Sequence, residues 1–581
     1  MAANEETWLS TRGSTRPRHS RLSRLLPAAL DPKRSFRLRL AGLLLLSATV
    51  AFYGLGSYGI INGNESLYVE SAREMLRSGN FAIPTLDGLP YLEKPPLFVW
   101  LIAAASSIFG TSELAARSTT ALATMALVIS TSAFAKRLGI GATGVGAGLI
   151  LLTSLGIDIM SRVAMPDLLL TALFGAACCS FLLAVRHRSV ASIRGCAAIL
   201  GAATMVKGPL TIALFVMIAG AYFWRQSSRR RDILAVVRDP WAALLLLTPM
   251  ALWLVAIDLR QPGAAWYFIV NEQVLRFLGL RQPHDYYSGS VFYYFPRLFL
   301  FFFPWVGVLV FGWLVSRKQP DSSKEEARRF LWLCVWIPFS FFSLSSAKAN
   351  YYVVLCLPAM ALLAADYLPT LLRDSNRGIL TLSVATPVLL LIGLWTFRLL
   401  ALSSGRARHL FPNQDGTVPL TIASLSIIAL ITVSLLQFGW RRAAVLCLGA
   451  LIIPLSLEFD HIIARAEPLM SARTLAMYVR TRFPGAPVLL FQDFESFGAL
   501  PVYLGHEVPV IDSQSADLYF GKRLHPHHVM LLTEDQALAS GPRTLIVVMN
   551  DRERAFTATR IERHVTRVTT IGRATLYQIV R

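Results

Sequence analysis

The sequence contains few charged residues and few cysteines for its length. Charged residues make up 16% of the 581 residues, whereas soluble domains contain about 25%. All six cysteines lie inside apolar runs, and none of them has the spacing of a metal site or the placement of a disulfide in an exported domain. These shortages exclude an ordinary soluble domain and a small disulfide-stabilised fold.

Apolar sequence and positive charge are both abundant. Hydrophobic residues make up 54% of the chain and the formal net charge is +21, with a mean hydropathy of +0.51. Membrane proteins concentrate Lys and Arg in their cytoplasmic loops. We therefore interpret the positive charge as loop charge and not as a nucleic-acid-binding surface, and we predict a polytopic α-helical membrane protein with lipids as neighbours.

The first residues fix the expected orientation. Residues 1–40 carry nine Lys and Arg against three Asp and Glu, and the composition of 1–39 is typical of a disordered basic arm on the cytoplasmic side. The apolar run that follows lacks a small-residue cleavage site, so we expect a membrane anchor and not a signal peptide. The first outer loop, 62–112, then faces the periplasm or the cell exterior.

The distribution of cations predicts thirteen spans. If 96–109 crossed the bilayer, Lys136 and Arg137 would lie outside, so we assign 96–109 to an interfacial helix on the outer surface. Arg398, Arg406 and Arg408 are an exception, because they lie in a predicted outer loop. The predicted spans are 40–61, 113–135, 141–160, 166–185, 190–206, 208–224, 240–258, 291–316, 328–345, 352–371, 378–401, 418–440 and 443–459.

The chain divides into a membrane domain and an outer tail. Residues 40–459 form the predicted transmembrane domain. From 460 to 581 the pattern changes to a helical stretch, ARTLAMYVRTRF, and strand-like runs, VLLFQD, TLIVVMND and ATLYQIV, which Gly and Pro turns separate. We predict a small α/β domain on the periplasmic side there.

Several charged residues converge on the outer face of this topology. Charges at membrane depth usually line a cavity and mark a functional path, although each one alone is also explained by solvation, a salt bridge or helix capping. Carboxylates suit the activation of a hydroxyl nucleophile, and cations suit an anionic phosphate leaving group. The pattern indicates group transfer from a lipid phosphate, and the residues are Glu65, Glu93, Lys94, Asp167, Lys207, His284 and Lys348, with Tyr351 beside Lys348.

A set of motifs in fixed order resembles a known family. The set resembles the membrane glycosyltransferases of the GT-C superfold that use polyprenyl-phosphate sugars, and it is most similar to the aminoarabinose transferases and the dolichyl-phosphate-mannose protein mannosyltransferases. The motifs lie within about residues 40–370, and they are NESLYVESAREMLRSGNF, LDGLPYLEKPPLFVW, GTSELAARSTTAL, SRVAMPDLLLT, VKGPL, RQPHDYYSG and SSAKANYYVVLCLPAMALL.

The resemblance implies roles for individual residues. It implies a catalytic acidic pair in the first outer loop, where this chain has Asn64-Glu65, so we expect Glu65 or Asp167 to act as the base. It implies that Lys94 binds the lipid phosphate, helped by Lys207, Lys348 and Tyr351. It also implies that Glu93, together with His284, holds a possible divalent metal ion.

We therefore expect an inverting glycosyltransferase of the cell inner membrane. It would move a sugar from a polyprenyl phosphate to an acceptor on the outer face. The expected acceptor is a glycolipid similar to lipid A, and the alternative is a protein hydroxyl, as in protein O-mannosyltransferases. A transporter or flippase is a hypothesis of another class, which the one-sided charges and the absence of a sequence repeat disfavour. An inactive lipid-sugar-binding relative also stays open, because Asn64 cannot act as a base.

Overall fold

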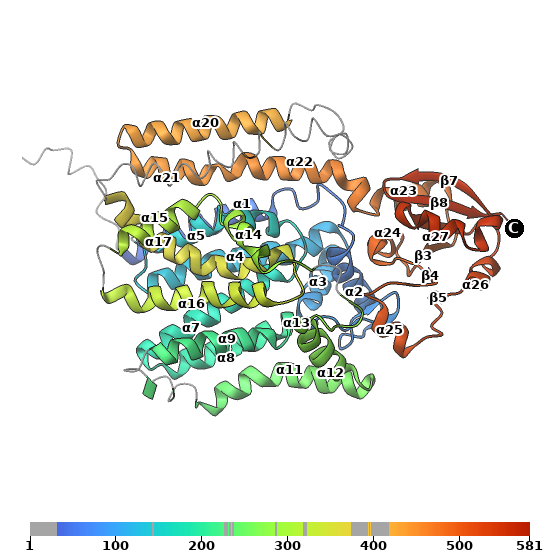
Figure 1. Cartoon of the computed structure of the whole chain (residues 1–581), viewed down its shortest axis with the longest axis horizontal. Helices are drawn as coiled ribbons and strands as arrows, with labels where there is room; N and C mark the ends of the chain where they lie inside the picture. Colours follow the sequence, from blue (N-terminus) through green and yellow to red (C-terminus); the bar gives the residue numbers. More distant parts are fainter. Residues whose placement is uncertain are drawn as a thin grey trace, which may run out of the picture.

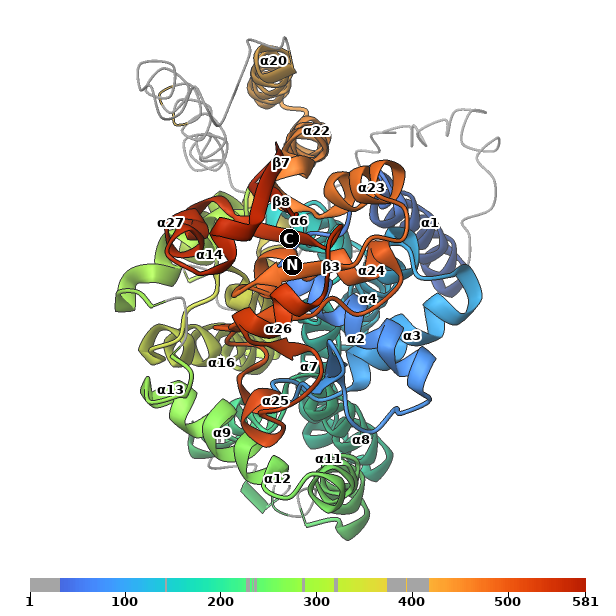
Figure 2. The same ribbon diagram turned by 90° about the vertical axis from the view of Figure 1, so that its right-hand side faces the viewer.

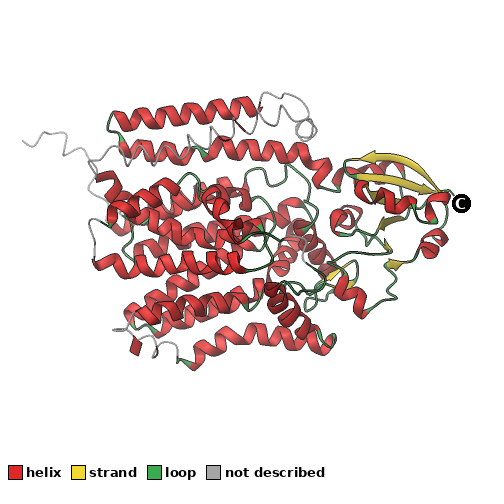
Figure 3. Cartoon of the chain, viewed as in Figure 1, coloured by secondary structure: helices red, strands yellow, loops and turns green. Residues whose placement is uncertain are grey.

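The structure is a computed structural model, and it combines a long helical bundle with a β-sheet at one end (Figure 1, Figure 3). It describes residues 32–373 and 417–580, apart from gaps at 142–143, 226–229, 232–233, 235–237, 285–287 and 318–321, together with the single positions 393 and 396. The strands are confined to the end of the molecule at which the C-terminus lies (Figure 3).

The helical bundle has the composition of a multi-pass membrane protein. Within the described residues, nine helical segments are long and apolar enough to cross a bilayer, or ten if one bent pair counts as a single span. The predicted total of thirteen is not confirmed, and the predicted span 378–401 lies outside the described residues. The long segments contain α1 (Pro32–Phe52), α4 (Glu113–Arg137), α7 (Asp167–His187), α8 (Val190–Lys207), α11 (Pro240–Arg260), α16 (Ser322–Leu344), η5 (Asn350–Cys356) with α17 (Leu357–Arg373), α20 (Thr417–Gln437), and α21 (Arg441–Ala450) with α22 (Ile452–Met470).

Two spans that we predicted as continuous are broken. The segment 141–160 divides into α5 (Gly146–Leu152) and α6 (Leu155–Ser161). The Thr153 and Ser154 hydroxyls between them donate back to carbonyls of α5 at 2.7 and 2.6 Å, a bonding pattern that bends helices. The segment 291–316 bends by 95° between the helical stretch ending with α14 (Tyr294–Phe301) and α15 (Val306–Ser316), because Pro304 cannot donate a backbone hydrogen bond.

Two further predicted spans have other bounds in the structure, whereas the predicted interfacial helix 96–109 agrees with the observed helix. Helix α1 begins at Pro32 and ends at Phe52, not at 40 and 61, and Gly54 follows its end with a positive φ of 71°. The predicted span 208–224 is the 16-residue helix α9 (Leu210–Arg225), and the interfacial stretch is the 13-residue helix α3 (Leu97–Phe109). Both are apolar but shorter than a typical span of about 20 residues.

The first outer loop packs between the bundle and the sheet. It contains α2 (Asn64–Ser78), the short antiparallel pair β1 (Thr85–Leu86) and β2 (Leu89–Pro90), and α3. Helix α2 covers most of the motif NESLYVESAREMLRSGNF, along which charged residues recur. Its polar residues Glu70 and Glu74 are nevertheless buried. Arg73 pairs with Glu70 and also donates to the Gly505 carbonyl at 3.3 Å, directly after α24 (Leu500–Leu504). The view from the sheet end shows α24 beside α2 (Figure 2).

The end of the chain forms a six-stranded mixed sheet. The strand order is β5-β4-β3-β6-β8-β7, in which the first four strands are parallel and the last two are antiparallel. One face packs in a common core with α2 and α3, while helices of the domain cover the other. The elements are α23 (Arg473–Arg482), β3 (Val488–Phe491), α24 (Leu500–Leu504), β4 (Val510–Ile511), α25 (Tyr519–Leu524), β5 (Leu531–Leu532), α26 (Glu534–Ala539), β6 (Leu545–Met549), α27 (Glu553–Thr557), β7 (Val565–Ile571) and β8 (Ala574–Ile579).

Candidate active site

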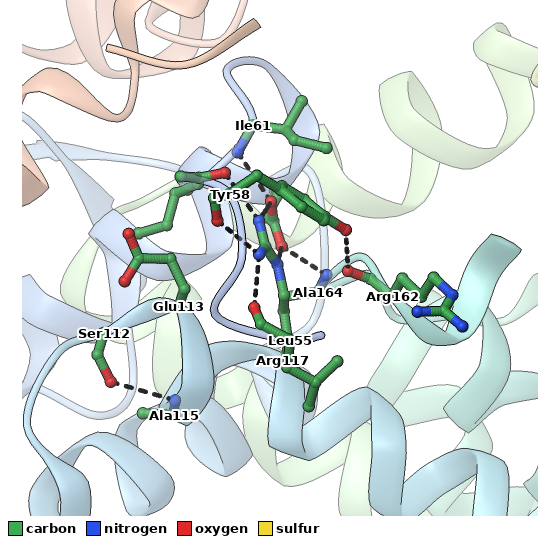
Figure 4. A network of polar contacts seen from close by, with 12 residues as sticks. Leu55, Tyr58, Ile61, Ser112, Glu113, Ala115, Arg117, Arg162 and Ala164 are labelled. Carbon is green, nitrogen blue, oxygen red and sulfur yellow. Dashed lines mark hydrogen bonds and ion pairs between the residues drawn. The ribbon is translucent and has the colours of Figure 1, made fainter. Parts of the chain in front are cut away.

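A buried ion pair fixes the start of the first outer loop. Arg117 of α4 donates two hydrogen bonds to the Glu65 carboxylate, at 2.8 and 2.9 Å, and three more to backbone carbonyls of the segment between α1 and α2. The backbone N–H groups of Ile61 and Ala164 also donate to Glu65, both at 2.8 Å. Figure 4 shows Arg117 at the centre of this network. With four bonds on a fully buried carboxylate, Glu65 has the environment of a structural residue.

A second buried pair joins the first turn of α7 to the last turn of α8. Lys207 donates to Asp167 Oδ1 at 2.6 Å, and Asp167 is 3% exposed. The other oxygen, Oδ2, is buried and has no hydrogen-bond partner among the described residues. The Lys207 ammonium also lies 4.5 Å from the ring centroid of Tyr352 and 5.4 Å from that of Tyr351. Asp167 therefore has a free acceptor atom beside a fixed cation.

The predicted Glu93-Lys94 pair belongs to a cluster of five charged residues. Arg281 donates to Glu93 and also to Glu272, the latter at 2.8 Å. Arg276 donates to Glu272 at 3.2 Å, and its guanidinium lies 4.0 Å from the Glu93 carboxylate, as does the Lys94 ammonium. Three cations thus face two carboxylates.

Burial and neighbouring charges shift the pKa values in this cluster. Burial, together with the positive charge of Arg276, lowers the pKa of Lys94 to about 8. Burial is the largest influence on the pKa of Glu93 and would raise it, but the positive charges of Arg281, Lys94 and Arg276 together outweigh burial and hold that pKa below the ordinary value. Glu93 is therefore charged at neutral pH, and Lys94 lies close to its titration point.

A cavity of about 400 Å³ opens beside this cluster. Lys94, Lys207 and Arg276 contribute positive charge to its lining, and Glu272 contributes one carboxylate. The remaining wall is largely apolar and aromatic, and it includes Leu210, Ala213, Phe277, Phe341 and Phe342. The cavity can hold an anionic head group in continuity with a hydrocarbon chain.

Other predicted site residues lie elsewhere. The buried Lys348 ammonium donates to the carbonyls of Phe342 and Ser343 at 3.0 and 2.7 Å, so it caps the end of α16 and does not line the cavity. Asn64 is exposed at the first position of α2, and His284 is also exposed. Of the predicted cations, the structure therefore brings Lys94 and Lys207 to one cavity, with Tyr351 beside Lys207.

The described residues do not fit the possible divalent metal ion. They contain no group of three or more His, Cys, Asp and Glu side chains arranged to hold one. Glu93 is paired with Arg281, and cations surround it. A divalent cation requires several oxygen or nitrogen ligands and an excess of negative charge, and this cluster has the opposite charge balance.

The prediction from sequence did not include Glu272, Arg276 and Arg281. Glu272 and Arg276 lie four residues apart in the amphipathic stretch WYFIVNEQVLRFLGL, on the helical segment made of η3 (Tyr267–Leu275) and α13 (Arg276–Leu278). A Glu–Arg pair at this spacing in an otherwise apolar stretch is a signal that the sequence contains. Arg281 carried no comparable pattern.

The fold of the chain matches that of a solved membrane protein. The structure of ArnT from Cupriavidus metallidurans bound to undecaprenyl phosphate superposes with a TM-score of 0.75 over 93% of this chain and 98% of that chain, at 21% sequence identity. The apo structure of the same protein gives a TM-score of 0.72. The chain is thus a multi-pass helical membrane protein with the GT-C fold.

Sequence relatives agree with this class over part of the chain. Residues 93–259 match the family described as dolichyl-phosphate-mannose-protein mannosyltransferase. The undecaprenyl phosphate-alpha-4-amino-4-deoxy-L-arabinose arabinosyl transferase of Aeromonas hydrophila is 28% identical over 54% of this chain and 57% of the relative. The protein of the same name from Yersinia pestis is 32% identical over 52% and 54%. The chain therefore resembles the aminoarabinose transferases, and it matches a little over half the length of these curated relatives.

Proposed function

We propose that the protein is a glycosyltransferase of the inner membrane that takes its sugar from a polyprenyl phosphate. The observation that carries this proposal is the cavity, in which three cations adjoin an apolar, aromatic wall. A phosphate joined to an isoprenoid chain needs this combination of surfaces. The names of the relatives, which specify undecaprenyl phosphate as the carrier, support it.

The buried pairs suit an inverting displacement. The acceptor oxygen forms a bond to the anomeric carbon while the bond from that carbon to the phosphate oxygen breaks, and the electron pair leaves with the phosphate. Lys94, Lys207 and Arg276 stabilise the phosphate charge. The acceptor proton passes to Asp167 Oδ2, which has no competing hydrogen-bond partner among the described residues. Glu65 instead holds α2 against α4 through Arg117.

The proposed acceptor is a glycolipid similar to lipid A on the periplasmic face. The aminoarabinose transferase relatives support this choice. The match of residues 93–259 to the protein mannosyltransferase family keeps a protein hydroxyl as the second candidate. In either case we infer that the sheet and the first outer loop face the periplasm, because the opposite ends of α4 and α7 carry Lys136, Arg137 and Arg186.

A reconstituted assay tests the carrier and the chemistry together. Purified protein in lipid vesicles receives a polyprenyl-phosphate sugar and a glycolipid acceptor, and mass spectrometry follows the sugar. We expect Lys94→Met to reduce transfer at least about tenfold through weaker phosphate binding. The matched variant Lys136→Met, on the exposed far end of α4, should behave as the parent. Movement of the intact sugar lipid across the membrane without transfer would instead indicate a flippase, and binding without transfer would indicate an inactive relative.

A further inference from the structure

A second cavity lies where the C-terminal sheet meets the membrane domain. Its volume is about 380 Å³, within the range of about 300–1,000 Å³ typical of small-molecule sites. One side consists of residues that follow strands β3, β4 and β6, and the other side consists of the segment 61–63 and the end of α22. Within the second side, the Asn62 N–H donates to the Met470 carbonyl at 2.8 Å, and the Gly63 N–H joins the two sides by donating to the Glu495 carbonyl at 3.0 Å.

The strand order puts this cavity at a position that binds ligands in other open sheets. The chain adds β4 and β5 outward on one side of β3 and then returns to place β6 on the other side. The order therefore reverses between β3 and β6, and ligands bind outside the carboxyl ends of parallel strands at such a reversal. Gln492 and Asp493 follow β3, and Arg552 follows β6.

Gln492 has two features of a ligand-binding residue. Its side-chain oxygen Oε1 is buried and has no hydrogen-bond partner among the described residues. Its backbone is held at a φ of 62° by bonds to β4 and to Gln514, at 2.9 Å each. Such conformations persist when the surrounding structure over-determines them, and they cluster at functional sites.

The lining has the chemistry of a carbohydrate site. Gln492 offers an acceptor, and the carboxylate of Asp493, which accepts from the Ser496 N–H and hydroxyl at 3.2 and 2.7 Å, has further lone pairs. Arg552, which donates to Gln514 at 3.3 Å, offers donors. Sugar hydroxyls both donate and accept, so they match such a mixed set. An apolar part of the lining can pack against the C–H face of a sugar ring, and it consists of Leu475, Phe497, Met549 and Ile571.

We propose that this cavity binds a saccharide, as a second carbohydrate site distinct from the phosphate cavity. The saccharide is either the sugar part of the acceptor or a separate glycan, because both present the same hydroxyl groups. The site gives the C-terminal sheet a function in recognition, and its binding activity does not depend on transfer.

A binding measurement on the full chain tests this site. In lipid nanodiscs, saturation-transfer NMR with the neutral disaccharide chitobiose should show transfer to the sugar protons. Gln492→Leu and Gln514→Leu should each weaken binding about tenfold, because each removes a hydrogen-bonding group from the cavity. The control Gln578→Leu, on β8 and outside the cavity lining, should bind as the parent. Unchanged thermal unfolding of the variants establishes that they are folded.

Two results would overturn the proposal: no saturation transfer with the parent protein, or equal binding by the parent and both cavity variants. Neither result depends on the sugar-transfer assay, so they are separate from a failure of the proposed enzyme. Where binding is weakened as expected, the kinetics of transfer identify the source of the saccharide. A raised KM for the glycolipid with unchanged kcat in Gln492→Leu assigns it to the acceptor, and an unchanged KM assigns it to a separate glycan.

Discussion

At the scale of single residues, the two carboxylates proposed as bases have opposite environments. Each Glu65 oxygen accepts two hydrogen bonds, one from Arg117 and one from a backbone N–H. Asp167 gives one oxygen to Lys207 and leaves the other without a partner among the described residues. A base needs a free acceptor within reach of the proton that it removes. The geometry therefore favours Asp167.

Asp167→Asn should lower the rate of sugar transfer by about 10²–10⁴, the range expected for the loss of a general base. The amide is close in size to the carboxylate, so binding of undecaprenyl phosphate should persist, which a direct binding titration checks. The exposed Asp535→Asn, at the start of α26, serves as the control. Transfer at the parent rate in Asp167→Asn would exclude this residue as the base.

Lys94 should make binding of the polyprenyl-phosphate sugar donor depend on pH. Because its pKa is lowered to about 8, the ammonium loses its proton and its charge as the pH rises through that value. The donor is a phosphodiester, whose charge is constant in this range. We expect kcat/KM for the donor to fall as the pH increases from 7 to 9. Lys94→Arg keeps its charge over the whole range and should give a flatter profile; an equally steep profile in this variant would show that another group titrates.

At the scale of secondary-structure elements, the residues of the site lie where helices break or end. The hydrogen bond from Leu155 to the Phe303 carbonyl, at 3.0 Å, connects the break between α5 and α6 with the break between α14 and α15. Lys207 ends α8 and Asp167 begins α7, so their pairing needs two neighbouring helix ends at the same level. The functional groups gather where regular helices stop.

The junction of α2 and α4 should depend strongly on its buried ion pair. Arg117→Met leaves the Glu65 carboxylate buried without a compensating charge, which costs about 3–5 kcal/mol. The free energy of unfolding, or the midpoint of thermal unfolding in detergent, measures this loss. Glu65→Gln separates the two roles of Glu65, because a structural residue lowers stability when changed, whereas a base lowers kcat at unchanged stability. The second result would restore Glu65 as the base.

At the scale of the whole molecule, the last long helical segment connects the sheet to the bundle. Arg162 at the end of α6 pairs with Asp460 of α22 at 2.7 Å and with Asp158 at 3.3 Å. Its side chain is 2% exposed. In the loop between β1 and β2, Asp87 accepts a hydrogen bond from the Val508 backbone N–H at 2.8 Å. The Arg162–Asp460 and Asp87–Val508 contacts join residues far apart in sequence, and they hold α22 and the C-terminal part, which lies at one end of the bundle (Figure 1), against the rest of the chain.

Arg162→Met should loosen this attachment. It leaves the buried Asp158 and the partly buried Asp460 without their cation, at a cost of about 3–5 kcal/mol for the buried carboxylate, so hydrogen exchange along α22 should become faster than in the parent. Arg329→Met removes an exposed arginine that pairs with Glu325 one turn away, and such surface pairs contribute about 0.3–0.5 kcal/mol. Equal exchange in both variants would show that Arg162 does not hold α22 in place.

The composition and the distribution of Lys and Arg along the chain by themselves determined that this is a multi-pass helical membrane protein, and the motifs indicated its fold. Long apolar runs can form only a few structures in lipid. The local patterns also identified α2, Lys94, Lys207 and Asp167, because Pro and charge interrupt apolar sequence at these points.

Tertiary structure alone decided which charges meet. The role of Glu65, as a base or as a structural residue, depends on its hydrogen bonds with Arg117, which lies 52 positions away. The partner of Glu93 is Arg281, 188 positions away. Lys348 does not line the cavity with Lys94 and Lys207, because its ammonium caps the end of α16. No local pattern encodes such pairings, since they follow from how helices pack in three dimensions. The same holds for the cavity between the C-terminal sheet and the first outer loop, whose two walls come from opposite ends of the chain.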